Sequence, residues 1–159
     1  MASTLRFDNW EDSNGTPILD GSNLAIPSSA LPTGSILQVV SEQATADFTT
    51  TSPTAVDITG FTATITPTSA TSTILILLTM EHRASSSSTR NVFNLYKDGG
   101  NLVEFASQNV GNYDHYLALN FKNSPATTSA VTYKVVVRVQ NGGTFTGKPR
   151  SITLMEVAG

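Results

Sequence analysis

The sequence predicts an all-β protein, a jelly-roll-like antiparallel β-sandwich preceded by an extended N-terminal arm. Three observations predict this fold class. Threonine and serine make up 41 of the 159 residues, apolar and polar residues alternate over many short runs, and Gly- and Pro-containing turn signals separate those runs at close spacing. No apolar period of helical spacing extends beyond two turns, so no helix is predicted. A closed barrel is the alternative architecture.

Nine strands are predicted between residues 34 and 159. They are Ile36–Ser41, Val56–Ile58, Phe61–Thr66, Thr73–Arg83, Val92–Lys97, Leu102–Ser107, His115–Lys122, Thr132–Gln140 and Ser151–Val157. The segment 132–140 alternates most clearly, with Val136 as its exception. The segment 61–66 alternates apolar residues with threonine, whose β-branched side chain suits a strand and whose hydroxyl suits water.

One of these strands differs from the others. Ile74–Leu78 is apolar at every position, so this segment is expected to be a central strand or to lie at a subunit interface. Asp98-Gly99-Gly100-Asn101 predicts a hairpin turn, because glycine accepts the positive φ that such turns need. The Ser/Thr-rich segment 84–89 predicts a surface loop.

Residues 1–33 form a segment of different character from the predicted sandwich, 34–159. Pro17, Pro27 and Pro32 interrupt it, yet it contains the only Trp of the chain among seven other large apolar residues, which is unusual for a disordered tail. Its acidic residues give the segment 1–21 a net charge of −3, and the rest of the chain is neutral. The segment is either a solvated acidic tail or an arm that docks on a basic partner surface. The predicted partner-binding residues of the arm are Leu5, Phe7, Trp10, Ile18 and Leu19.

Composition and motifs argue against most other functions. A neutral sandwich has no basic stripe for nucleic acid, the longest apolar run is too short for a membrane helix, and no signal peptide is visible. No cysteine is present, and no P-loop, G-x-S-x-G or dinucleotide motif occurs. His82 and His115 have no second metal ligand at a useful spacing, and the loop around Asp12 lacks two ligands of a calcium site. We therefore predict no catalytic residues, no metal site and no cofactor, and a protein that is not an enzyme.

The segment Asn109–Phe121 carries aromatic residues interleaved with amides. Tyr113, His115, Tyr116 and Phe121 alternate there with Asn109, Asn112 and Asn120. Such a pattern can stack on a sugar ring and bond its hydroxyls. The alternative is a strand edge whose aromatic side chains pack in a core or subunit contact.

Four segments follow one another along the chain. They are 34–40 (GSILQVV), 62–76 (TATITPTSATSTILI), Tyr133-Lys134-Val135 with Asn141-Gly142-Gly143-Thr144, and 152–157 (ITLMEV). In this order they resemble tailed-phage virion proteins of the tail-fibre-like group, with many marine examples. The resemblance covers residues 34–159, and the segment 5–10 (LRFDNW) is similar to leading segments of some such proteins.

The resemblance implies a structural virion component, often a homotrimer, that catalyses no reaction. Its expected partners are other virion proteins of the capsid, collar or tail, and its expected location is the virion. Because only about 33 residues precede the β module, a head decoration, collar or short fibre fits better than a long fibre. The alternative function is a receptor-binding module that recognises host surface carbohydrate.

Overall fold

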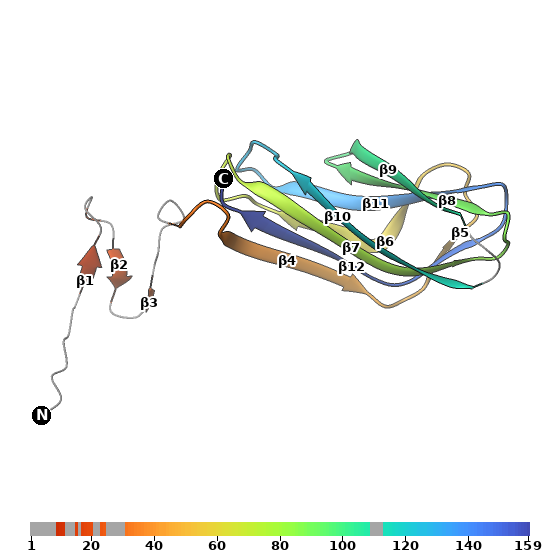
Figure 1. Cartoon of the computed structure of the whole chain (residues 1–159), viewed down its shortest axis with the longest axis horizontal. Coiled ribbons are helices and arrows are strands. Elements are labelled where there is room, and N and C mark those ends of the chain that lie inside the picture. Colours follow the sequence, from red (N-terminus) through yellow and green to blue (C-terminus); the bar gives the residue numbers. More distant parts are fainter. Residues whose placement is uncertain (1–8, 12–14, 16, 21–22, 25–30, 109–112) are drawn as a thin grey trace, which may run out of the picture.

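In a computed structural model, the described residues are 9–11, 15, 17–20, 23–24, 31–108 and 113–159. Their regular elements are all strands, which Figure 1 labels in chain order. The strands are β1 (Asn9–Glu11), β2 (Pro17–Asp20), β3 (Asn23–Leu24), β4 (Ile36–Ala44), β5 (Phe48–Thr50), β6 (Val56–Ile65), β7 (Thr73–Ala84), β8 (Arg90–Lys97), β9 (Gly100–Gln108), β10 (Asp114–Asn123), β11 (Val131–Gln140) and β12 (Phe145–Val157).

Two antiparallel sheets face each other in the sandwich (Figure 1). The first sheet has the order β10-β7-β12-β4, with β5 also paired to β12, and the second has the order β6-β11-β8-β9. Taken along the chain, the eight long strands alternate between the sheets except at the hairpin β8–β9, which lies in the second sheet, and this is the strand order of a jelly roll. The predicted fold class is therefore confirmed, and the closed-barrel alternative is wrong.

The core lies between the two sheets and contains the apolar residues that the alternation places inward. Tyr133, Phe61, Phe93 and Phe145 are its largest fully buried side chains. The hydroxyl of Tyr133 donates a hydrogen bond of 2.8 Å to the side-chain oxygen of Asn123, so the one buried phenol is satisfied.

The predicted strands are present, but several of them begin or end at other residues than predicted. The apolar strand 74–78 is the middle of β7, which lies centrally between β10 and β12 as predicted. The buried exception Val136 lies where the register between β11 and β6 shifts, as expected of a β-bulge. The strand β5 was not predicted, and β12 begins at Phe145 rather than at residue 151.

The two predicted strands 56–58 and 61–66 are one strand, β6, because Gly60 continues it. Gly60 has a φ of +72°, and a Cβ at this position would lie 2.5 Å from the Cβ of Ala44 on β4. The glycine therefore permits both the irregular backbone and the close approach of β4 to β6. It is a feature of the strand rather than a turn that ends it.

The described part of the arm contains three short antiparallel strands that pair only with one another, in the order β1-β2-β3. Trp10 lies opposite Leu19 in this small sheet. In Figure 1 it lies outside the sandwich, at the end where β4 begins and the chain terminates. The arm is thus not extended throughout. Leu5 and Phe7 lie outside the described residues.

Candidate interaction surface

The arm enters the sandwich at a hollow between the start of β4 and the end of β12. The hollow has a volume of about 410 Å³, and Leu31 and Leu37 line it together with the turn 68–72 and Ala158. The amide of Gly34 donates to the carbonyl of Ala158 at 2.9 Å, and the amide of Ala158 donates to the carbonyl of Ser35 at 2.9 Å. These contacts hold residues 34 and 35 against the end of β12.

A buried carboxylate holds this end of the sandwich together. Glu156 is fully buried on β12 and accepts hydrogen bonds from the Gln38 side chain at 2.6 Å and from the Thr68 amide at 2.7 Å. Burial alone would raise the pKa of Glu156, but the hydrogen bonds from Gln38, Ser72 and Thr68 outweigh burial and lower this pKa. The carboxylate therefore joins β4, β12 and the turn 68–72 into one rigid floor beside the arm.

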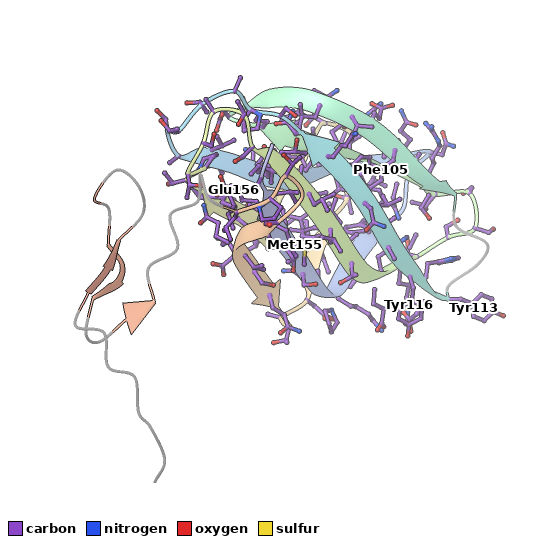
Figure 2. All side chains as sticks on the ribbon, turned by 60° about the vertical axis from the view of Figure 1, so that its left-hand side comes forward. Phe105, Tyr113, Tyr116, Met155 and Glu156 are labelled. Atoms are coloured by element: carbon purple, nitrogen blue, oxygen red, sulfur yellow. The ribbon has the colours of Figure 1, made fainter. Side chains whose placement is uncertain are left out.

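Next to this floor, the first sheet carries apolar side chains on its outer face. Val39, Met155 and Leu75 lie directly opposite one another on β4, β12 and β7, so they share one face. Leu77 follows Leu75 on that face, and Ile36 lies opposite Val157, two residues beyond Met155. We call this set the outer apolar patch; its members are Ile36, Val39, Leu75, Leu77 and Met155. Met155, labelled in Figure 2, pairs with both Val39 and Leu75.

The outer apolar patch is open to solvent. Ile36 is 57% exposed, Val39 is 52% exposed and Leu75 is 37% exposed. Six large apolar side chains of the described residues are exposed, and these three of the six adjoin one another. A contiguous exposed apolar set on a sheet face is typical of a contact with another chain.

The opposite end of the same face is polar and ionic. Arg83 donates two hydrogen bonds of 2.8 Å to Asp114, and Lys148 lies 3.0 Å from Asp114 and 2.9 Å from Glu81. The hydrogen bonds from Arg83 and Lys148 lower the pKa of Asp114 to about 2. These four charges neutralise one another, so this end provides no strong field for a charged partner.

A shallow hollow adjoins the ion pairs. Its volume is about 310 Å³, and Tyr116, Ala118, Glu81, Thr79 and Pro149 are among its lining residues. Tyr116 is 80% exposed and Tyr113 is 72% exposed. Figure 2 shows both tyrosines at the end of the sandwich away from the arm.

The segment Asn109–Phe121 was predicted either to bind a sugar or to pack its aromatic side chains in a core or subunit contact, and its residues divide between exposed and packed positions. Tyr116 and Asn120 are exposed on the outer face. Phe121 instead packs between the sheets, where the centre of its ring lies 6.0 Å from the centre of the Phe105 ring. His115 stacks on His82 with a ring-centroid distance of 5.6 Å. Asn109 and Asn112 lie outside the described residues.

His82 is a core residue. It is 1% exposed and contacts the rings of Phe93 at 5.6 Å and Phe145 at 5.9 Å. Burial, together with the neighbouring His115, lowers the pKa of His82 to about 4. The described residues contain no group of three His, Cys, Asp or Glu side chains that could hold a metal ion.

The predicted arm residues and the outer apolar patch are different parts of the chain. Trp10, Ile18 and Leu19 lie in β1 and β2. Leu75 and Leu77 of the patch belong to the apolar run 74–78, which was predicted to be a central strand or to lie at a subunit interface. The other three patch residues were not singled out from the sequence. No comparable signal marks Val39 or Met155, because their role depends on the pairing of strands distant in sequence. No helix of the described residues is long and apolar enough to cross a membrane.

Comparison with known proteins gives structural neighbours only. No protein-family model matches the chain, and no curated protein matches it. A solved structure of infectious bursal disease virus, Gx strain, is similar over 77% of this chain and 32% of its own, with 16% identity and a TM-score of 0.50. The structure of the Gt strain is similar over 74% of this chain and 31% of its own, with 15% identity and a TM-score of 0.49. A crystal structure of the T13 particle of the same virus is similar over 76% of this chain and 35% of its own, with 15% identity and a TM-score of 0.46.

The Gx strain structure supports the fold alone, at this level of identity. This chain spans about a third of the length of the viral chains that it matches.

Proposed function

We propose that the protein is a structural component of a bacteriophage virion, of the capsid-decorating or short-fibre type. In this proposal residues 1–33 are the arm that attaches it to neighbouring virion proteins of the capsid, collar or tail, sister copies included. Residues 34–159 are the sandwich, the assembled form is a homotrimer, and the protein catalyses no reaction.

The outer apolar patch is the observation that carries this proposal. It is a contiguous apolar set on the face of a folded sandwich, beside the point at which an apolar arm leaves. A protein that acts alone in solution gains nothing from two such surfaces, whereas an assembling subunit needs both. The jelly-roll order of the strands, shared at fold level with a chain of infectious bursal disease virus, supports the same proposal.

Deleting residues 2–22 is expected to leave a folded sandwich that no longer joins the particle. Those residues include all five predicted partner-binding residues of the arm, and the strands within them pair with no strand of the sandwich. The measurement is occupancy after purified protein is added to particles that lack it, with circular dichroism as the control for folding. Equal occupancy by the truncated and full chains would show that the arm is not the anchor.

Within the arm, Trp10→Ala is expected to reduce occupancy more than Asp12→Ala does. A buried indole contributes several kcal/mol at roughly 25 cal/mol per Å² of apolar area. A charge at the rim of an interface contributes little, although four acids can steer the arm toward a basic surface at low salt. Titrating both variants against particles at two salt concentrations separates the two effects. A larger loss of occupancy for Asp12→Ala than for Trp10→Ala would show that the arm docks by electrostatic attraction rather than by apolar contact.

Recognition of a host surface glycan is a second candidate function, favoured by Tyr116. Its exposed ring borders a hollow with the carboxylate of Glu81 and the hydroxyl of Thr79, and this arrangement suits the apolar face and the hydroxyls of a sugar. Tyr116→Ala is expected to weaken binding to purified envelope polysaccharide of the host at least tenfold, whereas Tyr116→Phe keeps the ring and the binding. Biolayer interferometry measures both variants. Equal binding by Tyr116→Ala and the unmodified protein would remove this candidate.

A further inference from the structure

No residue that the structure describes covers the outer apolar patch. The strands β1, β2 and β3 pair only with one another, and Ile36, Val39 and Leu75 remain exposed. The patch spans three adjacent strands of one sheet, so its apolar side chains form one continuous surface. Its occupant must therefore come from outside the folded sandwich.

The path of the chain at Leu31 leads the arm away from its own patch. Leu31 lines the hollow beside the turn 68–72, and that turn is bonded to the inward-facing Glu156. The outer apolar patch lies on the other side of the sheet, on the face to which Met155 points. At Leu31 the described chain thus lies at the end of the sandwich and not on its own outer face.

The arm is long enough to reach a neighbour. Leu19 pairs with Leu24, and ten residue steps separate Leu24 from Gly34. Fully extended, these ten steps span up to about 33 Å at about 3.3 Å per residue, which is most of the roughly 40 Å length of a strand such as β7. Leu19 and Trp10 can therefore reach the face of an adjacent sandwich even though they lie in short paired strands.

We propose that the arm of one copy docks on the outer apolar patch of a second copy. Each copy then gives one arm and receives one arm, which is a head-to-tail contact that closes when the copies form a ring. Apolar arm residues meet an apolar face, and the acidic arm side chains lie at its rim, where Lys122 pairs opposite Leu75. This inference rests on the proposed function in using the arm as the attachment element, and it names the surface that the arm recognises.

The inference is tested with full-length chains that each lack one half of the contact. The arm variant carries Phe7→Ser with Trp10→Ser, and the patch variant carries Val39→Asp. Leu75→Gln is a second patch variant, in case an aspartate on β4 impairs folding. Leu102→Asp is the matched control, because Leu102 is 41% exposed and lies on β9 of the other sheet.

Sedimentation velocity at increasing protein concentration is the measurement. We expect the unmodified chain and Leu102→Asp to form the same oligomer, and each arm or patch variant to associate at least tenfold more weakly. Mixing the arm variant with the patch variant is expected to restore a one-to-one dimer, since the mixture contains one intact arm and one intact patch.

Three results would overturn the inference. An arm variant that still forms the oligomer would show contact between the sandwiches themselves. A mixture that stays monomeric would show that arm and patch do not meet. An unmodified chain that stays monomeric at tens of micromolar, yet still occupies particles, would leave the proposed function standing and assign the arm to a different virion protein.

Discussion

Replacing Arg150 with methionine is expected to lower the free energy of unfolding by about 3 kcal/mol or more. Arg150 is 3% exposed, and its guanidinium donates hydrogen bonds to the backbone carbonyls of Thr59, Ala46 and Lys148. Each buried acceptor that loses its donor costs about 1–3 kcal/mol. Burial lowers the pKa of Arg150, and Asp47 offsets this in part, so removing the buried charge recovers some of the loss.

Arg138→Met is the matched control for this prediction. Arg138 also lies on a strand of the sandwich, but its partner is the exposed carboxylate of Glu104 at 3.2 Å. An exposed ion pair contributes about 0–1 kcal/mol, so this variant is expected to remain near the stability of the unmodified chain. Urea denaturation of both variants measures the difference. A loss below about 1 kcal/mol for Arg150→Met would mean that water replaces the guanidinium at the three carbonyls.

The stability of the sandwich is expected to fall by about 2 kcal/mol between pH 7.5 and pH 5 because of His82. The folded state holds the pKa of His82 at about 4, below its ordinary value of 6.5. The unfolded chain therefore binds a proton near pH 6.5, and the folded chain binds it only near pH 4. The contribution of His82 to stability is complete above pH 6.5 and is lost as the pH falls from 6.5 toward 4.

His82→Leu tests this assignment, because leucine has a similar volume and no proton to bind. The variant is expected to change little in unfolding free energy between pH 7.5 and pH 5, whatever its absolute stability. Because the pKa of Asp114 is about 2, that carboxylate does not titrate in this interval. Denaturation curves at four pH values provide the comparison. Equal pH dependence in both proteins would assign the titration to another group.

The inward-facing residues could be predicted from the sequence because period-two alternation is a local property. Phe61, Ala63 and Ile65 are buried and the threonines between them are exposed, as the alternation predicted. The strand β5 was missed because Phe48–Thr50 is too short to alternate. Gly60 lies between the two predicted strands 56–58 and 61–66, and a glycine in a turn and a glycine at a close approach look alike in a sequence.

The outer apolar patch could not be predicted in the same way. Leu75 and Ile76 are equally apolar, and only the second sheet decides that Ile76 is buried while Leu75 is exposed. Val39 and Met155 become neighbours through the pairing of β4 with β12, which local sequence does not specify. The partners of Arg150 are backbone carbonyls, and every residue carries one, so no residue type marks them.

The position of β12 in the first sheet determines when that sheet can form during synthesis of the protein. This strand, Phe145–Val157, lies between β7 and β4, and these two strands have no common neighbour until it has been made. The first sheet therefore closes only after residues 145–157 have left the ribosome, and long-range pairing of this kind takes milliseconds to seconds. During that interval the edges of β4 and β7 are open to other nascent chains. The first sheet is thus completed only by β12, and open strand edges on unfinished chains are the hazard that follows from this strand order.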